Sequence, residues 1–440
     1  MNKPKISVIG LGFVGLTLAV VNAKENFETI GIDIDKEKLE KLRSGKPDFY
    51  EPKLKNYLNK SLKTKKIHFS DDLNQVLKTD ISFITVGTPS TANGAIDLSY
   101  LKKVVVNLSK ILKNKKSTHL IVVKSTVLPT TTLQMVSPVF KKMKNVRVVS
   151  NPEFLREGNA INDLEKPHLI VIGESNRKDG DILEKYYKMF YKKIPEILRV
   201  DLTSAEMIKY TNNAFLATKI SFINSIANIC QKLPNVDVNK IAYAIGKDSR
   251  IGSEFLKAGP GFGGSCLPKD ISALIEFTKK YDKTNKLFKA VKEVNIYQAS
   301  QILQIIKEMN LFASNKTISI LGLAFKANSD DVREAVSIRI VKHLIKKGMK
   351  IKVHDPMAMN NFQKIFGDKI IYCKTIPDCL KNSECCLILT EWNEYKNLKP
   401  LIFSKNMHKS NIVDARRVLE PSNFTKLNFR AMGLGPQAVN

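Results

Sequence analysis

The first 33 residues constrain the fold of this chain more than any other stretch. A short β-branched run at residues 6–9 leads into a glycine-rich turn at residues 10–15, and a helix-like apolar segment follows at residues 16–24. A second apolar run, residues 29–32, ends at Asp33. These offsets are typical of a dinucleotide-binding unit, in which glycines let a pyrophosphate approach a helix N-terminus and an acid accepts the ribose hydroxyls. Because no Arg directly follows Asp33, the pattern favours NAD over NADP.

The alternation of apolar runs and polar turns continues through the N-terminal half. Further apolar runs, each followed by a polar segment, lie at residues 81–86, 119–123 and 146–149, with the polar segments at 87–90, 124–126 and 150–153. In an open parallel sheet, ligands bind at the carboxyl ends of the strands. We therefore expect the polar segments to line the cofactor cleft, although each alone is also compatible with a plain turn.

Residues 318–325 are nearly a copy of residues 6–13. Ala324 replaces the second glycine, where a pyrophosphate would need the closest backbone approach, and Lys326 follows. Later apolar runs lie at residues 351–355, which again end in Asp, and at 385–389 and 411–413. The copy predicts a second Rossmann-type unit that has lost its dinucleotide fingerprint and gained a cation.

A chain of 440 residues is too long for a single core. Its patterns predict the α/β fold class, with two Rossmann-type doubly wound parallel-sheet domains joined by a central long-helix region. We expect the domains to span residues 1–200, 201–300 and 301–440.

A glycine-rich loop lies near the middle of the chain, with four glycines at residues 259–264 and Cys266 just after them. Few side chains obstruct such a loop, so its backbone amides can approach an anionic ligand while one thiol is presented beside it. Cys266 is therefore a candidate nucleophile. The alternative is a flexible surface loop with an incidental cysteine. The other five cysteines form no C-x-x-C pair and have no histidine at metal spacing, so we expect reduced thiols, a cytosolic compartment and no metal.

Two further groups of polar residues are candidates for chemistry. A helical pattern opens at the cap-like Thr203 and runs to about Lys232, and it places Lys209 and Asn213 on one face amid apolar neighbours. Glu153 and Glu157 are four residues apart and would share one face if their segment were helical. The alternatives are an ordinary exposed lysine and a pair of helix-capping glutamates.

The formal net charge of +29 raises the possibility of a nucleic-acid-binding protein. However, the lysines are spread through the whole chain without interleaved aromatic residues, which favours solvated surfaces. The apolar N-terminus resembles a signal peptide, but its glycines and the Asp-ended strand argue against that interpretation. We expect a cytoplasmic protein without a nucleic-acid or membrane partner.

Seven blocks in order, taken together, resemble the UDP-glucose/GDP-mannose dehydrogenase family. They lie at residues 10–15, 86–89, 125–127, 151–158, 205–213, 263–270 and 322–326, the last followed by Asp331, Arg333 and Glu334. Residues 248–252, 255–256 and 258–261 look most like the members that oxidise UDP-glucose. The block at 263–270 is shared with GDP-mannose enzymes, and Ser265 stands where the UDP-N-acetylhexosamine branch usually has a histidine.

The resemblance implies a four-electron oxidation of a primary alcohol to a carboxylate, with two NAD per turnover. The substrate would be UDP-glucose, or alternatively GDP-mannose or a UDP-N-acetylhexosamine. Cys266 would capture the intermediate aldehyde and then carry a thioester. The catalytic residues implied are Cys266, Lys209, Asn213, Asp270, Glu153 and Thr126.

The resemblance also assigns binding roles to the three parts of the chain: NAD-binding, dimerisation with the cysteine loop, and UDP-sugar binding. NAD would be bound by Gly10, Gly12, Phe13, Val14, Gly15, Asp33, Lys38, Thr88, Thr126, Glu157, Lys269 and Arg333. The nucleotide-sugar would be bound by Glu153, Phe154, Leu155, Arg156, Lys209, Asn213, Arg250, Lys257, Gly259, Gly261, Phe262, Gly263, Phe325, Lys326 and Arg416. In such proteins the residue at Arg250 comes from a neighbouring subunit, so a homodimer through the central helix is expected.

Overall fold

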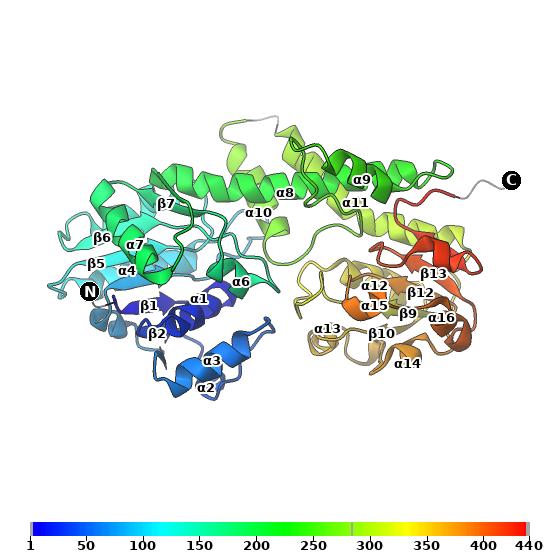
Figure 1. Cartoon of the computed structure of the whole chain (residues 1–440), viewed down its shortest axis with the longest axis horizontal. Coiled ribbons are helices and arrows are strands. Elements are labelled where there is room, and N and C mark those ends of the chain that lie inside the picture. The colour runs from blue at the N-terminus through cyan, green and yellow to red at the C-terminus, as the bar shows by residue number, and fades with distance from the viewer. Residues whose placement is uncertain (1–2, 283–284, 437–440) are drawn as a thin grey trace. The chain divides into compact units, whose positions relative to one another are not determined.

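The computed structural model describes residues 3–282 and 285–436. The chain forms two compact units, which divide between Asn212 and Asn213 (Figure 1). The predicted boundaries at residues 200 and 300 stay a prediction. The long helix α8 (Leu202–Cys230) contains the point of division, and each unit has its own sheet and its own core.

The described part of the first unit contains an eight-stranded sheet in the order β3-β2-β1-β4-β5-β6-β7-β8. Its strands are β1 (Ile6–Ile9), β2 (Thr29–Ile32), β3 (Ile67–Ser70), β4 (Ile81–Ile84), β5 (His119–Val123), β6 (Val146–Ser150), β7 (Ile170–Glu174) and β8 (Ile197–Val200). The first six strands are parallel and follow the order expected of a dinucleotide-binding fold. The strands expected at 6–9, 29–32 and 119–123 have the predicted bounds.

Helices cover both faces of this sheet because its central strands are apolar on both sides. Ile6 and Val8 point into one core, while Ile9 points into the other. The first core is closed by α1 (Phe13–Lys24), α2 (Lys36–Arg43), α3 (Leu54–Lys63), α6 (Ala160–Glu165) and α7 (Arg177–Phe190). The second is closed by η1 (Leu73–Lys78), α4 (Ser99–Leu112), η2 (Thr132–Val136) and α5 (Ser137–Phe140).

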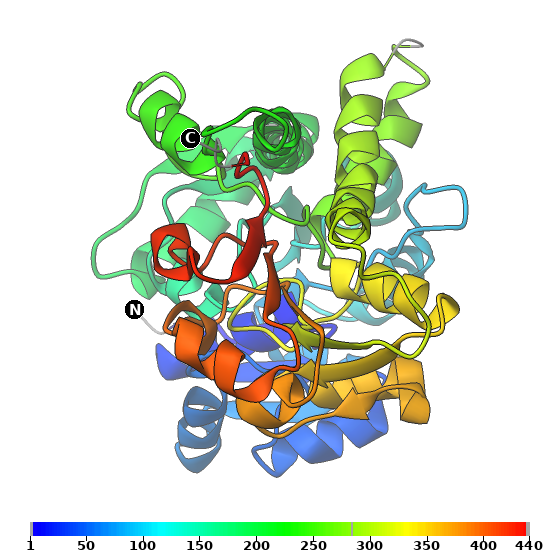
Figure 2. The same ribbon diagram turned by 90° about the vertical axis from the view of Figure 1, so that its right-hand side faces the viewer.

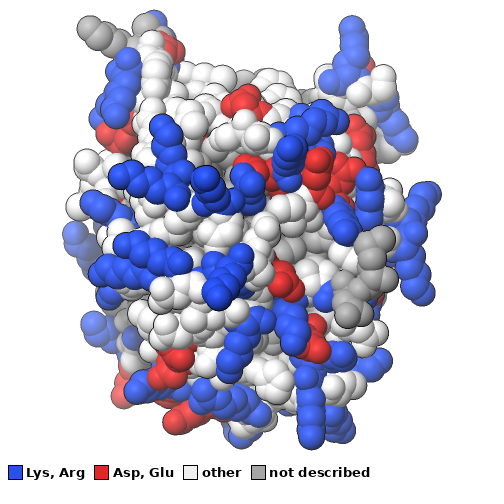
Figure 3. Space-filling model, turned by 90° about the vertical axis from the view of Figure 1, so that its left-hand side faces the viewer, with Lys and Arg blue, Asp and Glu red and all other residues white. Residues whose placement is uncertain are grey.

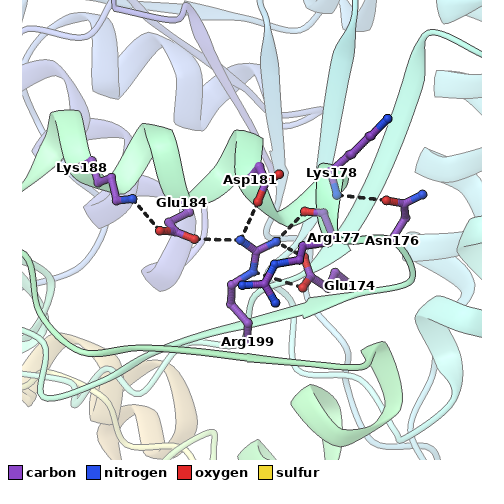
Figure 4. Close-up of polar contacts among 8 residues, drawn as sticks. All are labelled: Glu174, Asn176, Arg177, Lys178, Asp181, Glu184, Lys188 and Arg199. Carbon is purple, nitrogen blue, oxygen red and sulfur yellow. Dashed lines mark hydrogen bonds and ion pairs between the residues drawn. The ribbon is translucent and has the colours of Figure 1, made fainter.

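The last two strands of this sheet run against the others, because β7 pairs with β6 in antiparallel register. The strands β7 and β8 correspond to no predicted strand, while the predicted α/β fold and the Rossmann order of the first six strands are confirmed. Arg199 of β8 fastens this edge to α7 (Figure 4). Its guanidinium binds Glu174 at 2.5 Å, Asp181 at 2.6 Å and Glu184 at 2.8 Å.

The second unit contains, among its described residues, a six-stranded parallel sheet in the order β11-β10-β9-β12-β13-β14. Its strands are β9 (Thr317–Leu321), β10 (Lys350–His354), β11 (Ile371–Tyr372), β12 (Cys385–Ile388), β13 (Asn411–Asp414) and β14 (Asn428–Ala431). This order repeats that of the first six strands of the other sheet, so the predicted second Rossmann-type unit is confirmed. The strand expected at 318–325 ends at Leu321, because the glycine turn begins there.

Helices pack on both faces of the second sheet around a single large core (Figure 2). They are α12 (Val336–Lys346), α13 (Met359–Phe366), η3 (Gly367–Lys369), α14 (Ile376–Leu380), α15 (Asn393–Lys396), α16 (Pro400–Asn406) and η4 (Pro421–Phe424). Ahead of this sheet in the chain lie α9 (Val238–Gly246), α10 (Leu267–Thr278) and α11 (Lys286–Glu308). The cysteines at 230, 373, 379, 385 and 386 are buried, as expected of structural thiols.

The central helix α8 begins one residue earlier than expected. Asp201 and not Thr203 caps it, since the Asp201 carboxylate accepts hydrogen bonds from the Ser204 amide at 2.9 Å and the Ser204 hydroxyl at 2.5 Å. No helix in the described ranges is long and apolar enough to cross a bilayer. Lysine and arginine side chains are spread over the face seen in Figure 3 with acidic residues between them, which agrees with the predicted solvated surface.

Candidate functional site

The glycine turn after β1 forms a cradle for an anion. Gly10 has a φ of +92° and packs against the segment after β4, where a side chain would collide with backbone. A side chain at Gly15 would overlap the Gly10 carbonyl, whereas one at Gly12 would meet nothing within 4 Å. Gly12 precedes α1 without a side-chain cap. The first turn of this helix, which begins with Phe13 and Val14, is therefore open to a pyrophosphate.

The other expected NAD residues of this unit gather at the carboxyl ends of neighbouring strands. Asp33 follows β2, and its Oδ2 accepts the Leu11 amide at 2.7 Å. Lys38 Nζ lies 3.4 Å from the same oxygen. Thr88 follows β4 and donates its hydroxyl to the Thr126 carbonyl oxygen at 2.9 Å. A glycine cradle beside an acid at the second strand fits the pyrophosphate and ribose of NAD.

Glu153 and Lys209 form a buried ion pair. Lys209 Nζ lies 3.2 Å from Glu153 Oε1, and the two side chains are 5% and 6% exposed. The other carboxylate oxygen accepts the Leu155 amide at 2.5 Å. The ring of Phe154 also lies near the ammonium, with its centroid 5.5 Å from Nζ. The exposed-lysine alternative is therefore wrong for Lys209.

Glu153 and Glu157 do not share a helical face. The segment from Glu153 to Arg156 is irregular, Glu157 begins a turn, and α6 starts only at Ala160. Glu157 is buried. The guanidinium of Arg156 binds Asp163, with Nη2 2.6 Å from Oδ1. The predicted substrate and cofactor roles of these residues stay predictions.

No individual role was predicted for three residues of this unit, although two of them lie in the polar segments expected to line the cofactor cleft. Lys124 and Asn151 are buried directly after β5 and β6, and their side chains are joined at 2.9 Å. Glu206 of α8 accepts the Thr132 amide at 2.8 Å, and burial raises the pKa of its carboxyl group to about 7. The only local signal was a polar residue adjoining a buried apolar run or lying within an apolar helix.

The glycine-rich loop of the second unit is buried and held by specific hydrogen bonds. The Gly259 amide donates to Asn224 Oδ1 at 2.8 Å. The Asn295 side chain accepts the Phe262 amide at 2.7 Å and donates to the Phe262 carbonyl at 2.9 Å. Gly261 has a φ of +99°, and a side chain there would collide with Asn295. The alternative of a flexible surface loop is wrong.

Cys266 is exposed at the start of α10, in contrast to the other five cysteines. Four residues on, the carboxylate of Asp270 is buried. Asn213 Nδ2 donates to Asp270 Oδ2 at 2.7 Å, and Lys269 Nζ lies 2.6 Å from Oδ1. The predicted catalytic residues of this unit are thus gathered at one helix N-terminus, where a thiol is presented beside a charged, hydrogen-bonded cluster.

The second glycine turn copies the first in backbone but not in its acid. Gly322 has a φ of +99° and packs against Thr390, and Asp355 Oδ2 accepts the Leu323 amide at 2.7 Å. Here, however, Asp355 is buried and also accepts the amides of Ala324, Met357 and Ala358 and the Trp392 ring N–H. Its carboxylate is fully occupied by the protein.

The predicted nucleotide-sugar residues of the second unit fall into two groups. Gly263 and Gly264 pack against Phe325, and Arg416 donates to the Phe325 carbonyl at 2.5 Å. Lys326 Nζ lies 5.6 Å from the centroid of the same ring. Lys257 and Arg250 are more exposed, and Arg250 pairs with Asp248. Arg333, which was predicted to bind NAD, is also exposed and pairs with Asp331.

Models of the UDP-glucose/GDP-mannose dehydrogenase family match three consecutive parts of the chain. The NAD binding domain matches residues 4–191, the central domain residues 203–297 and the UDP binding domain residues 319–421. The first match agrees with the open glycine cradle, so NAD is the cofactor of this chain.

Relatives of known name match along almost the whole chain. UDP-glucose 6-dehydrogenase TuaD of Bacillus subtilis is 38% identical over 440 residues, covering 99% of this chain and 94% of that protein. UDP-glucose 6-dehydrogenase of Rickettsia bellii is 38% identical over 433 residues, covering 98% and 99%. The solved structure of a UDP-glucose dehydrogenase from Pyrobaculum islandicum superposes with a TM-score of 0.90 at 35% identity, covering 99% of this chain and 98% of that one. A chain with these two sheets and these matches belongs to the UDP-glucose/GDP-mannose dehydrogenase family.

Proposed function

We propose that this protein oxidises UDP-glucose at C6 to UDP-glucuronate, with two NAD consumed per turnover. The observation that carries the proposal is the exposed Cys266 at the start of α10, four residues before the buried Asp270, which is bound by Asn213 and by the partly buried Lys269. A nucleophile placed next to groups that can move a proton is what the second oxidation of an alcohol requires. The names of the similar proteins support UDP-glucose as the substrate.

Bound NAD supplies the oxidising power, because its nicotinamide accepts one hydride in each oxidation. Asp270 takes the C6 hydroxyl proton through a water, and Lys209 assists. Cys266 Sγ then bonds to C6 of the aldehyde and forms a thiohemiacetal, whose oxyanion Lys209 and Asn213 stabilise by about 3 kcal/mol per good donor. The second oxidation leaves a thioester, so the reactive aldehyde does not escape.

Glu153 is the base for the last step. It takes a proton from a water positioned by Thr126, and the resulting hydroxide adds to the thioester carbonyl. The C–S bond breaks, the carboxylate leaves, and the Cys266 thiolate is restored. The short link between Thr88 and the Thr126 carbonyl supports this role, since it fixes the backbone of the positioning residue.

The turn after β9 holds the uridine diphosphate. The backbone copy of the first turn, Lys326 beside Phe325 and the partly buried Arg416 offer amides and cations to an anion. Gly259, Gly261, Phe262 and Gly263 present a rigid backbone to the same ligand.

The experiment is a comparison of NADH formation with UDP-glucose, UDP-N-acetylglucosamine and GDP-mannose. We expect two NADH per UDP-glucose and a much lower rate with the other two sugars. Cys266→Ser is the control, and it should lose carboxylate formation. Turnover of either other sugar faster than UDP-glucose would replace the substrate assigned here, and no turnover of any would contradict the dehydrogenase.

We also propose a homodimer through α8. Phe215, Phe222 and Ile229 repeat at intervals of seven on this helix and are 63%, 52% and 57% exposed. Such a stripe suits the same helix of a second copy. Light scattering should give twice the chain mass of 49.5 kDa. Phe222→Glu should give monomers, whereas Lys240→Glu, at an exposed position of α9, should not.

A further inference from the structure

A lysine lies in the interior of the first unit, directly after β5. Lys124 is only 5% exposed. Its Nζ lies 2.9 Å from Asn151 Oδ1 and 3.4 Å from the Asn151 carbonyl oxygen. A buried ammonium is costly unless polar or charged groups compensate it. The neighbours of Lys124 therefore have to explain why a cation stands here.

Asn151 is the first of these neighbours, and its side chain is held on three sides. Its Oδ1 accepts the Tyr187 hydroxyl at 2.5 Å as well as Lys124, and its Nδ2 donates to the Val171 carbonyl oxygen at 2.7 Å. Asn151 stands two residues before Glu153. The ammonium thus fixes the start of the irregular segment that carries Glu153.

The second neighbour is the Glu153 carboxylate itself. Burial lowers the pKa of Lys124 to about 8, the Glu153 carboxylate opposes this decrease and the Lys209 ammonium adds to it. At neutral pH Lys124 is therefore mostly charged, and Glu153 has two cations near it. A cavity of about 60 Å³ adjoins both Lys124 and Glu153 and has room for a few water molecules.

We propose that Lys124 is a positioning residue for the reaction. Its ammonium holds Asn151 and, through it, the backbone before Glu153, and its positive charge favours the carboxylate form of Glu153 that accepts a proton from the hydrolytic water. This inference rests on the function proposed above, in which Glu153 is the base of the last step. It predicts that loss of the charge slows thioester hydrolysis more than it slows the oxidations.

Other titratable groups near Glu153 could also change the pH dependence of thioester hydrolysis, so the experiment has to account for them. Those that line the cavity are Asp163, Lys166, His168, Tyr186, Tyr187 and Tyr191. Asp163 is bound by Arg156, and burial raises the pKa of Tyr186 and Tyr187 far above the working range. His168 is exposed. Its titration is removed by repeating each measurement in a His168→Gln background.

The variants are Lys124→Met, which removes the charge, and Lys124→Arg, which keeps it. Lys166→Met is the matched control, because Lys166 lines the same cavity but is exposed. In Lys124→Met we expect the acid limb of thioester hydrolysis to move up by about one pH unit. We also expect the Cys266 adduct, measured by mass spectrometry after an acid quench, to accumulate at least about tenfold. In Lys124→Arg the acid limb of thioester hydrolysis should return to its position in the unaltered protein. Lys166→Met should match the unaltered protein in both measurements.

A purely structural role would give another pattern. Equal slowing of oxidation and hydrolysis in Lys124→Met, with the acid limb unmoved, would overturn the proposal. If Lys124→Met does not fold, nitrogen-15 NMR of labelled lysines in the unaltered protein decides the matter. The proposal requires a charged Lys124 at pH 7, and a neutral amine there would contradict it.

The two proposals can fail separately. The Lys124 titration, and a carbon-13 titration of Glu153 assigned with Glu153→Gln, need no substrate. If the Glu153 titration moves in Lys124→Met as expected but no Cys266 adduct forms in the unaltered protein, the proposed function alone is contradicted. An adduct in the unaltered protein together with an unmoved Glu153 titration in Lys124→Met would contradict the role of Lys124 alone.

Discussion

Lys209 and Glu153 face each other at 3.2 Å with almost no exposure to solvent, so neither charge has bulk water to replace its partner. Removing one member of such a pair takes from the other the counter-ion that contacts it. In Lys209→Met we expect the free energy of unfolding to fall by about 3 kcal/mol. The double variant Lys209→Met/Glu153→Gln should recover most of this loss, because the uncompensated carboxylate is then neutral. Denaturant unfolding of the four proteins measures the cycle, and a double variant as unstable as Lys209→Met would contradict it.

Cys266 should react alone among the six cysteines in the folded protein. It is exposed, whereas burial raises the pKa of Cys230 and Cys385 and keeps those thiols protonated. Cys373 is the stringent case, because the neighbouring Cys379 thiol lowers its pKa although only 6% of it is exposed. Intact-mass measurement after iodoacetamide should show one adduct, and activity should be lost in parallel. Cys266→Ser should take up none, and the unfolded chain should take up six. A second adduct in the native protein would mean that a buried cysteine becomes accessible, for example Cys373 through opening of the core of the second unit.

Asp33 and Asp355 should respond differently to the same change. Asp33→Asn should weaken NAD binding about tenfold or more, because a neutral amide is a poorer acceptor for ribose hydroxyls. Asp355→Asn should leave NAD affinity unchanged but destabilise the second unit by about 2 kcal/mol, since its carboxylate accepts five protein donors. Calorimetric titration with NAD and denaturant unfolding separate the two effects. Weaker NAD binding in Asp355→Asn would show that the second acid is not merely structural.

Glu206 makes stability depend on pH. Burial raises the pKa of its carboxyl group to about 7 from an ordinary value of 4.5. Between these values the unfolded chain releases the proton while the folded protein keeps it, so the free energy of unfolding falls as pH rises. Above pH 7 the loss in free energy of unfolding that is due to Glu206 levels off at about 3 kcal/mol.

The variant Glu206→Gln should therefore stabilise the protein at pH 8 and have little effect at pH 4. Thermal unfolding across this range measures the difference. The exposed Glu40→Gln on α2 serves as the control and should change stability by less than about 0.5 kcal/mol at every pH. A gain in Glu206→Gln that is the same at both pH values would rule out titration as its cause.

Local sequence predicted the parallel strands well because each is a β-branched run bounded by a turn. The strands β1, β2 and β5 have the predicted bounds for this reason. In contrast, β3 alternates between buried and exposed residues, and β8 is only half buried, so neither stands out as an apolar run. The reversed direction of β7 and β8 depends on the antiparallel pairing of β7 with β6, which no local pattern encodes.

The parts of the candidate site that consist of particular residue types at fixed spacing along the chain were predictable from the sequence. The glycine turns, Asp33 and the Cys266 block are of this kind. The helical face for Glu153 and Glu157 was wrong, because the amides of Leu155 and Arg156 donate to the carboxylates of Glu153 and Asp163, and the segment stays irregular. Lys124 and Glu206 lie in segments that the sequence marked, but no individual role was predicted for them, since only the folded chain reveals that they are buried.

The Arg199 cluster has a consequence for how the protein behaves in a crowded solution. The strand β8 is an edge of the eight-stranded sheet and, among the described strands, pairs with β7 alone, so its outer side can offer backbone groups to another chain. Arg199 holds three carboxylates beside this edge, and the side chain of Asp181 is 58% exposed, so an incoming strand would have to strip water from that carboxylate. The residue that fastens the reversed strands to α7 therefore also protects the sheet against edge-to-edge aggregation.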